Sequence, residues 1–270
     1  MTDYLSHSPL GKKAAFSSFY DPTLLCPVPR EPARKKLGLN SYRLPFFGED
    51  IWNCWELSWL NPIGKPEVAV LELRVPATSP FIVESKSLKL YLNSLNMTRF
   101  ASDDELKKTI TKDLSEIVRT QVQAQVFMPN SFGDLAPAAP RGICLDCLDW
   151  KPESGETIET ENEIVSEEMY SNLLRTICPV TGQPDWATLG VRYTGQKILH
   201  QSLLSYLVGL REHAGFHETC VEMIFWKILQ ECAPEKLTVQ ARFTRRGGID
   251  INPSRSTDAE SFLNLRDFRQ

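Results

Sequence analysis

The sequence predicts an α+β fold made of two modules that share one topology. Its apolar content of 42% and charged content of 24% are typical of a globular protein with a packed core. Segments with the two-residue period of strands and segments with the helical period follow one another as strands, two helices, strands. That order occurs twice along the 270 residues. Short links between strands favour antiparallel sheets, with two helices packed on one face of each.

Residues 1–50 are predicted to form an irregular N-terminal arm that wraps the rest of the chain. Prolines stand at positions 9, 22, 27, 29, 32 and 45, and proline interrupts helices and central strands alike. The regular periods begin after this segment. We therefore assign residues 51–135 to the first module and residues 136–270 to the second.

Three strands are expected in the first module. Residues 52–60 are rich in aromatic side chains, residues 61–64 (Asn-Pro-Ile-Gly) are typical of a turn, and residues 67–75 form a second apolar run. Residues 122–128 place Val, Ala, Val and Met at alternate positions. This alternation predicts a third strand with one buried face.

Two helices are expected between the second and third of these strands. The first begins near Glu84, and its apolar residues recur at helical spacing between positions 88 and 95. The second follows Ser102 and Glu105, which have the spacing of a capping box, and keeps an apolar face through residues 106–118. Each helix therefore has one face suited to packing on a sheet.

The second module repeats this order of elements. Its expected elements are a strand-like segment at 143–150, an acidic loop at 153–168, a strand at 187–193, helices at 198–210 and 221–232, and a last strand at 237–243. The two modules share little residue identity, so the repeat is one of topology.

Composition and charge exclude several classes of partner. Thirty basic against 34 acidic residues give a net charge of −4, whereas direct binding to nucleic acid would need a basic face. No apolar run approaches the ~20 residues that cross a bilayer, and residues 1–10 lack the apolar segment of a secretory signal. The seven cysteines have no disulfide-framework spacing, and we interpret the lone Cys-x-x-Cys pair at 144–147 as structural. We expect a cytoplasmic protein with reduced thiols.

Cys178 is the first candidate for chemistry. It lies in the segment 176–185 (Thr-Ile-Cys-Pro-Val-Thr-Gly-Gln-Pro-Asp), whose prolines and glycine predict a rigid loop before a strand. A thiol fixed there can be partly exposed, and Asp185 can fold back onto the sulfur to transfer a proton. The alternative is a structural cysteine, because free cysteine is among the most buried residue types.

The second candidate is the pair His217 and Glu218, predicted at the start of a helix. The pair could hold and protonate a nitrogen-rich ligand, since a carboxylate accepts two parallel N–H bonds. Glu218 could instead merely complement the helix dipole. His213 and Cys220 raise the alternative of a zinc site, but residues 214–216 predict a break between helices, which spoils the ligand geometry.

The third candidate is the segment 83–89 (Val-Glu-Ser-Lys-Ser-Leu-Lys), which opens the first helix. Ser85 could cap this helix, where free backbone N–H groups need acceptors. Lys86 and Lys89 could reach a phosphate group. The alternative is a capped helix whose lysines are only solvated.

The fourth candidate is the segment 245–255, in which two arginines precede two glycines. Arginine is a strong anion donor, and glycine lets a ligand approach the backbone closely, so Arg246 and Gly247 are candidate phosphate contacts. The segment is not a dinucleotide fingerprint, because no Gly-x-Gly-x-x-Gly follows a strand. A surface turn with solvated arginines is the alternative.

These four segments resemble the 7-cyano-7-deazaguanine reductases, the QueF family, in their long, two-module form. The matching blocks are residues 84–93 (Glu-Ser-Lys-Ser-Leu-Lys-Leu-Tyr-Leu-Asn), the loop from Cys178 to Asp185, residues 216–218 (Phe-His-Glu) and residues 246–253 (Arg-Gly-Gly-Ile-Asp-Ile-Asn-Pro). The likeness spans about residue 40 to 255, and the glutamate–serine–lysine stretch is close to diagnostic. It implies tandem T-fold (tunnelling-fold) modules that associate through their sheets as a homodimer.

The resemblance also implies a reaction and the residues that perform it. The reaction is a four-electron reduction of the nitrile 7-cyano-7-deazaguanine (preQ0) to its aminomethyl product (preQ1), with two NADPH and no metal, on the route to queuosine in tRNA. Cys178 would be the nucleophile that forms a covalent thioimide, Asp185 the proton donor, and His217 the donor of a later proton. The residues implied to hold the base are Val83, Glu84, Ser85, His217 and Glu218. Those implied to contact NADPH are Ser85, Lys86, Arg246 and Gly247.

Two other functions are compatible with the same residues. One is a zinc-dependent hydrolase of the GTP cyclohydrolase type, with Cys178 and His213 or His217 as ligands. The other is a purine-binding module without catalysis. Stoichiometric zinc would favour the first, and binding that survives Cys178→Ala would favour the second.

Overall fold

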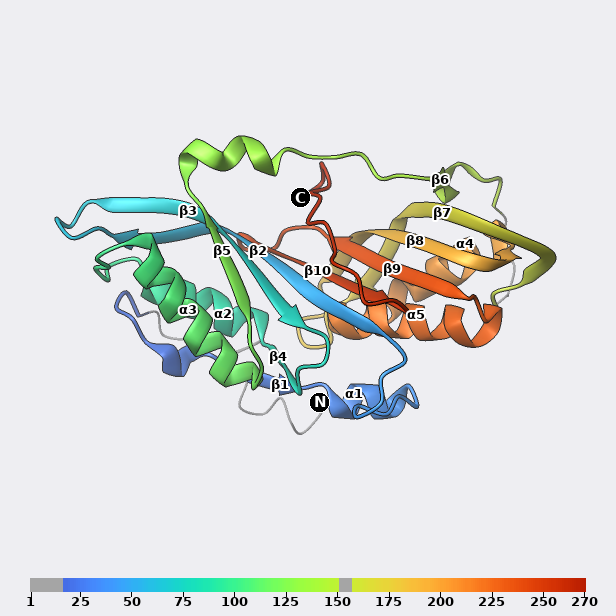
Figure 1. The fold of residues 1–270 in the computed structure, drawn as a ribbon, viewed down its shortest axis with the longest axis horizontal. Helices are drawn as coiled ribbons and strands as arrows, with labels where there is room; N and C mark the ends of the chain where they lie inside the picture. Colours follow the sequence, from blue (N-terminus) through green and yellow to red (C-terminus); the bar gives the residue numbers. More distant parts are fainter. Residues whose placement is uncertain (1–16, 151–156) are drawn as a thin grey trace.

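One sheet of eight strands runs through both halves of the molecule in the computed structural model, which describes residues 17–150 and 157–270 (Figure 1). The strand order is β5-β3-β2-β10-β9-β8-β7-β6. All neighbours are antiparallel except β6 and β7. Residues 1–16 of the predicted arm and 151–156 of the predicted acidic loop lie outside the described residues.

The first module has the three predicted strands and two predicted helices in the predicted order, and one short strand, β4, that was not predicted. They are β2 (Phe47–Leu60), β3 (Pro66–Pro76), β4 (Phe81–Val83), α2 (Ser85–Ser94), α3 (Asp103–Val118) and β5 (Gln123–Phe127). Ser102 caps α3 by accepting from the N–H of Glu105 at 3.2 Å, as predicted, although the Glu105 carboxylate reaches back to Ala101 rather than to Ser102. The apolar face of α3 packs on the sheet with Leu106 and Leu114 fully buried.

The second module repeats this order. Its elements are β6 (Ile143–Cys144), β7 (Thr160–Ile177), β8 (Pro184–Ile198), α4 (His200–Gly209), α5 (His217–Cys232), β9 (Lys236–Phe243) and β10 (Ile249–Ser256). A second apolar core fills the space between these strands and the two helices. The predicted α+β class, antiparallel pairing and repeated order are therefore confirmed. The expectation of a separate sheet for each module is corrected, because β10 pairs with β2 and makes the sheet continuous.

Two predictions about the second module were wrong. Residues 160–168 of the supposed acidic loop belong to β7, where Glu161 and Glu163 face solvent while the backbone pairs with β8. Acidic side chains need only water, so they do not prevent a strand whose backbone is paired. The segment 143–150 is a strand only at β6, because a 3₁₀ turn (Leu145–Cys147) follows at once.

The predicted arm is not wholly irregular. A short strand, β1 (Pro27–Pro29), pairs with β4, and the helix α1 (Glu31–Lys36) follows it. The regular strand β2 begins at Phe47. The arm therefore docks beside the segment that opens α2.

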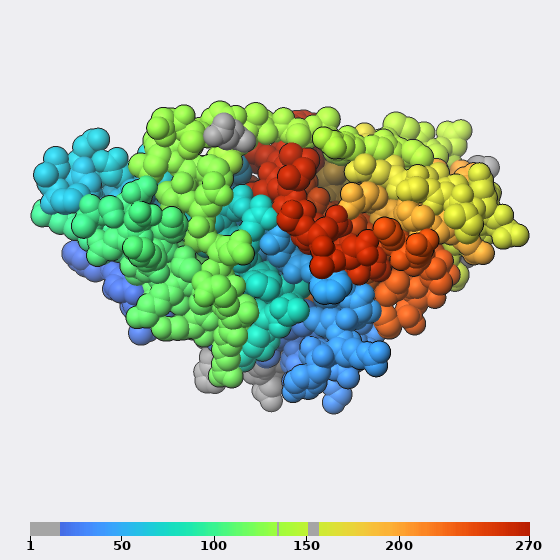
Figure 2. Space-filling view, in the orientation of Figure 1, coloured from blue at the N-terminus to red at the C-terminus, as the bar shows by residue number. Residues whose placement is uncertain are grey.

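The C-terminal segment, residues 257–270, connects the two modules at the surface, where Figure 2 shows it in red. Its Asn264 amide donates to Asn53 and Glu72 of the first module at 2.7 Å. Its Gln270 amide donates to Phe243 and Asn252 of the second. Among the described residues, no helix combines the length and apolar character that crossing a membrane requires.

Candidate active site

A narrow cavity of about 30 Å³ lies where the two modules meet. The first module contributes β4 and the start of α2. The second contributes the loop between β7 and β8, the start of α5, and the turn before β10. The lining residues that the sequence singled out are Val83, Ser85, Cys178, Asp185, His217, Glu218 and Arg246. One chain thus brings together the residues of four separate segments.

The Cys178 thiol is nearly buried but faces this cavity. A tight loop fixes the residue, with its N–H bonded to the carbonyl of Gln183 at 2.9 Å and Gly182 at a φ of +68°. Burial opposes ionisation of the thiol, yet hydrogen bonds from Thr181, Val180 and Arg246 outweigh burial and lower its pKa. A thiol with a lowered pKa beside a cavity is suited to nucleophilic attack.

Asp185 is buried at the start of β8, between two nitrogen groups. Arg246 Nε lies 2.9 Å from one carboxylate oxygen, and His217 Nε2 lies 3.4 Å from the other. Arg246 also helps to lower the pKa of the Cys178 thiol, so one guanidinium acts on both the acid and the sulfur. Cys178, Asp185 and His217, which can each gain or lose a proton, therefore line one cavity.

His217 is the first residue of α5, and its ring is held by stacking. The ring lies parallel to that of Phe243, with centroids 3.8 Å apart and an interplanar angle of 3°. Its Nδ1 is buried and finds no hydrogen-bond partner among the described residues. A buried polar atom without a partner is costly, so this nitrogen is free to serve a ligand.

Glu218 follows directly and is 3% exposed. Burial raises its pKa to about 8, and the negative charge of Asp50 acts in the same direction. Arg30 and Arg255 oppose this rise. The carboxyl is thus poised near neutral pH on the wall of the cavity.

Glu84, the other predicted base-binding glutamate, is engaged by its own helix. Its carboxylate caps α2 by accepting from the N–H of Lys86 at 2.7 Å and of Ser87 at 2.8 Å. The expectation that Ser85 caps this helix is therefore corrected: Ser85 is the first helical residue and lines the cavity instead. Glu84 is fully buried and does not line the cavity, whereas its neighbour Val83 does.

Basic side chains gather beside the cavity, around the turn between β9 and β10. Gly247 and Gly248 have φ angles of +61° and +78°, as a two-residue hairpin turn requires. Lys89 packs against this turn, since a Cβ added to Gly247 would lie 3.3 Å from Lys89 Cε. Burial and the charge of Arg246 lower the pKa of Lys89. Together with the half-buried Lys86, this cluster fits a ligand that carries phosphate groups.

No group of three or more His, Cys, Asp and Glu side chains in residues 17–150 and 157–270 is arranged to hold a metal ion. His213 lies outside the cavity lining, and burial lowers its pKa. The described residues therefore give no support to the zinc-hydrolase alternative.

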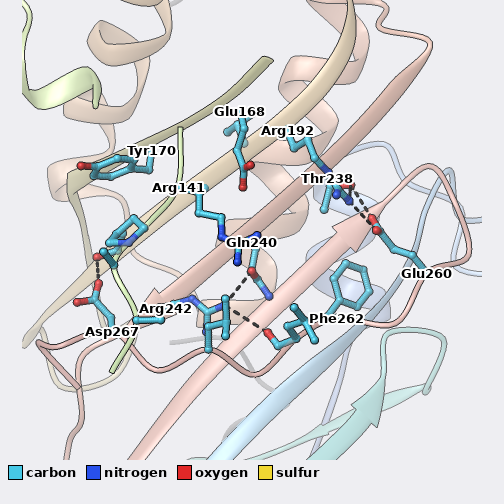
Figure 3. A pocket seen from close by; sticks show the side chains of 18 of the residues that line it. Arg141, Glu168, Tyr170, Arg192, Thr238, Gln240, Arg242, Glu260, Phe262 and Asp267 are labelled. Carbon is cyan, nitrogen blue, oxygen red and sulfur yellow. Dashed lines mark hydrogen bonds and ion pairs between the residues drawn. The ribbon is translucent and has the colours of Figure 1, made fainter. Parts of the chain in front are cut away.

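A second cavity of about 270 Å³ lies on the helix-free face of the sheet (Figure 3). Its floor is formed by side chains such as Tyr170, Arg192 and Gln240, which alternate along the strands with core residues. Arg192 pairs with Glu260 of the C-terminal segment at 2.6 Å. This cavity contains none of the predicted site residues.

Sequence reasoning gave no individual role to several residues of the site, although Phe216 and Ile251 lie within the matched blocks. Trp52, Phe216 and Ile251 form apolar walls of the cavity. Behind Glu218 lies a buried cluster of charges formed by Arg30, Arg34, Asp50, Glu222 and Arg255. These charged residues come from segments far apart in the sequence, so local spacing did not show that they would cluster.

Comparison with known proteins identifies the family. The model for the N-terminal part of the nitrile reductase 7-cyano-7-deazaguanine reductase matches residues 16–126, and the model for QueF-like proteins matches residues 184–261. The NADPH-dependent 7-cyano-7-deazaguanine reductase of Desulfotalea psychrophila is 52% identical, over 97% of both chains. The enzyme of that name from Azoarcus sp. is 48% identical, over 94% of this chain and 92% of its own.

Among solved structures, the apo form of the archaeosine synthase QueF-Like aligns with 37% of this chain and 99% of its own. The identity is 14% and the TM-score 0.31, too low to support an argument about the fold. The sequence comparisons decide the matter, because two family models match separate parts of the chain and the relatives are about 50% identical over nearly its whole length. The chain belongs to the QueF family of 7-cyano-7-deazaguanine nitrile reductases.

Proposed function

We propose that this chain reduces the nitrile of 7-cyano-7-deazaguanine to the primary amine, on the route to queuosine in tRNA. The observation that carries the proposal is a thiol of lowered pKa, Cys178, in one cavity with Asp185, His217 and Glu218. Relatives about 50% identical are named for this activity. A nitrile carbon is electrophilic but accepts hydride poorly. Addition of the thiol converts the nitrile into a group that accepts hydride more readily.

The first step is addition of the Cys178 sulfur to the nitrile carbon. A C–S bond forms, the C≡N bond becomes C=N, and the nitrogen takes up one proton. Asp185 accepts the thiol proton and returns it to that nitrogen, while Arg246 holds the carboxylate in place. The product is a covalent thioimide, whose C=N bond is reduced more readily than the nitrile.

NADPH, when bound, supplies the hydride for each of the two reductions. After the first, the C–S bond breaks, Cys178 regains its proton, and an imine remains in the cavity. His217 then protonates the imine nitrogen for the second reduction, since its ring faces the cavity and Asp185 contacts its Nε2. The chain's own part is therefore covalent capture and proton delivery.

Substrate choice rests on Glu218. As a carboxylate it can accept two N–H groups from the pyrimidine edge of the base, and a base that lacks these donors would leave a buried charge unpaired. Val83 and Ser85 line the opposite wall, and Glu84 keeps acceptor positions beyond the two that cap its helix. The cavity holds about one water in this state, so its walls must separate to admit the base.

Binding of NADPH is assigned to Ser85, Lys86, Arg246 and Gly247. They lie around the basic turn, where two guanidiniums and two ammonium groups can neutralise phosphates. Arg245 stacks on Trp55, with its guanidinium carbon 4.2 Å from the ring centroid, and its Nε lacks a hydrogen-bond partner among the described residues. This geometry supports a preference for NADPH over NADH, which lacks the additional phosphate.

We also propose that the chain works as a homodimer joined through its sheet edges. At one edge β5 pairs with β3 alone, and at the other β7 pairs with β6 only at Met169 and Tyr170, within the described residues. Open edges offer backbone donors and acceptors to a second copy. Analytical ultracentrifugation should give twice the mass of the chain, and a monomer at micromolar concentration would contradict the proposal.

Mass spectrometry of the intact protein tests the reaction. Mixed with the cyano base and no NADPH, the chain should gain the mass of one base on Cys178, and NADPH should remove it. Asp185→Asn should slow formation of this adduct by roughly two to four orders of magnitude. Cys178→Ala should form none. A wild-type chain that neither forms the adduct nor oxidises NADPH would end the proposal.

A further inference from the structure

The cavity on the helix-free face of the sheet has no part in the proposed function. We call it the sheet-face cavity; Arg141, Tyr170, Gln240, Arg242 and Phe262 are among the residues that line it. Its volume of about 270 Å³ far exceeds the ~10–15 Å³ that a single water needs. It shares no lining residue with the candidate active site. The sheet-face cavity is therefore a separate place that can hold a small molecule.

Arg242 lies on the floor of this cavity with one nitrogen unused. Its Nη2 donates to Gln240 at 3.0 Å and to the carbonyl of Leu263 at 3.3 Å. Its Nη1 is buried and has no hydrogen-bond partner among the described residues. Burial lowers the pKa of Arg242 to about 10, and the charges of Asp267 and Asp250 oppose this fall, so the guanidinium stays charged near neutral pH. A buried charge with an unused donor is costly unless an anion meets it.

Two carboxylates of the same cavity already have other donors. Glu260 pairs with Arg192 at 2.6 Å. Asp267 accepts from the Thr188 hydroxyl with one oxygen and from the backbone N–H of Arg269, at 3.0 Å, with the other. Neither acid bonds the unused nitrogen on the cavity floor, which is therefore left for a ligand.

A second guanidinium enters the cavity from the other side. Arg141 belongs to the segment between β5 and β6, and Figure 3 shows its side chain reaching into the cavity toward Gln240 and Arg242. Arg141 is exposed, so it can move to close over a ligand. Guanidiniums present their N–H groups in a planar fork that matches the oxygens of phosphate and carboxylate groups. Two of them at one cavity favour such a ligand.

We propose that the sheet-face cavity binds a small oxyanion, a phosphate or carboxylate group, between Arg242 and Arg141. Nη1 of Arg242 donates to one oxygen of the anion, and the Arg141 guanidinium covers the anion from the solvent side. The inference goes beyond the proposed function, because it uses none of the residues assigned to the base or to NADPH. The C-terminal segment also lines the cavity and is bonded to the first module through Asn264. A bound anion should therefore stabilise the contact between the two modules.

The test measures the melting temperature of the wild-type chain during titration with inorganic phosphate and, separately, with the dicarboxylate malonate. Sodium chloride at equal ionic strength is the reference. An anion that binds only the folded chain should raise the melting temperature by about 5 °C at a hundred times its dissociation constant. The stronger response distinguishes a phosphate from a carboxylate ligand, and either response supports the proposal. Phosphate also stabilises folded proteins without binding them, so each variant is titrated in the same way.

Three variants should change the affinity for the anion in opposite directions. Arg242→Gln removes the buried donor and should weaken binding about tenfold or more. Arg141→Gln should weaken it about threefold, because an exposed charge contributes less. Glu168→Gln removes a negative charge from the rim of the cavity and should strengthen binding about threefold. Arg141 and Glu168 are both exposed, so their variants decide the question if Arg242→Gln does not fold.

Two further variants locate the anion. Arg246→Gln removes a guanidinium from the basic turn between β9 and β10, and Cys178→Ala removes the thiol of the candidate active site. Both should keep the wild-type response to phosphate and malonate. The inference is overturned if neither anion raises the wild-type melting temperature above the chloride reference, or if folded Arg242→Gln responds as the wild type does. It is also overturned if Arg246→Gln abolishes the response, or if Arg141→Gln and Glu168→Gln change the affinity in the same direction.

Discussion

Two helices begin beside the cavity, and each begins with a buried glutamate, but the two glutamates are used differently. Glu84 precedes α2, and its carboxylate accepts hydrogen bonds from the backbone N–H groups of Lys86 and Ser87. Glu218 lies inside the first turn of α5, whose N-cap, Phe216, offers no side-chain acceptor. Burial raises its pKa to about 8, and Arg30 and Arg255 oppose this rise only in part.

These different contacts predict different roles for the two glutamates: Glu84 would stabilise its helix, and Glu218 would recognise the base. A carboxylate that caps its own helix is fixed by short local bonds, so its main contribution is stability. A buried carboxyl group that caps no helix keeps its oxygens available to a ligand, and burial raises its pKa. On the proposed function, we expect the first module to contribute mainly the supporting wall and cofactor contacts, and the second module to contribute the groups that react with and recognise the base.

The largest expected effect comes from Glu218→Gln. The substitution removes a charge that would accept two N–H groups, each worth ~1.5–3 kcal/mol, so affinity for the cyano base should fall about a hundredfold or more. Calorimetry in the Cys178→Ala background measures it. The melting temperature should not fall, because an amide is easier to bury than a carboxylate. An unchanged affinity would remove the contrast between the two glutamates.

The raised pKa of Glu218 should also be visible without any ligand, in the pH dependence of the free energy of unfolding. The pKa of Glu218 is about 8 in the folded chain and near 4 when unfolded, so the folded state binds more protons between these values. Stability from this group is therefore full at low pH and is lost as pH rises toward 8. Denaturant titrations at several pH values should show a smaller loss for Glu218→Gln than for the wild type. Equal slopes would mean that Glu218 is already ionised at neutral pH.

Glu84→Ala should affect stability more than recognition. Loss of the cap should lower the free energy of unfolding by about 1 kcal/mol, measured by urea denaturation. Affinity for the base should fall about tenfold, because the carboxylate keeps acceptor positions that a ligand could use. If the affinity loss equals that of Glu218→Gln, both glutamates recognise the base, and the division between the modules is wrong.

Local pattern predicted most of the fold, and polar strands were the exception. α3 shows the success, since Ser102 and the apolar spacing through Val118 specify both its start and its buried face. β10 shows the limit: its sequence Ile-Asp-Ile-Asn-Pro-Ser-Arg-Ser has apolar alternation only at the two isoleucines, yet every residue is buried. Its polar groups bond to residues distant in sequence, such as Arg255 to Asp50, 205 residues apart.

The same reason limited prediction of the site. Cys178 and His217 lie in motifs that a sequence displays, and the structure places them in one cavity. The partners of Arg30 come from distant parts of the sequence, such as Asp50 and Glu222, so no local pattern marks it. The roles assigned to the predicted residues stay proposals until the adduct and binding measurements are made.

The smallest expected effect is that of Ser102→Ala, which serves as a reference for the comparison of the two glutamates. Ser102 caps α3 on the exposed side of the first module and contacts no residue of the cavity. Its loss should lower the free energy of unfolding by about 1 kcal/mol, as for Glu84, while affinity for the base and the rate of NADPH oxidation stay at wild-type values. Because the stability losses match, any loss of affinity in Glu84→Ala but not in Ser102→Ala reflects contact with the substrate rather than a weakened helix. Reduced affinity in Ser102→Ala would show instead that the cavity responds to the stability of the whole module.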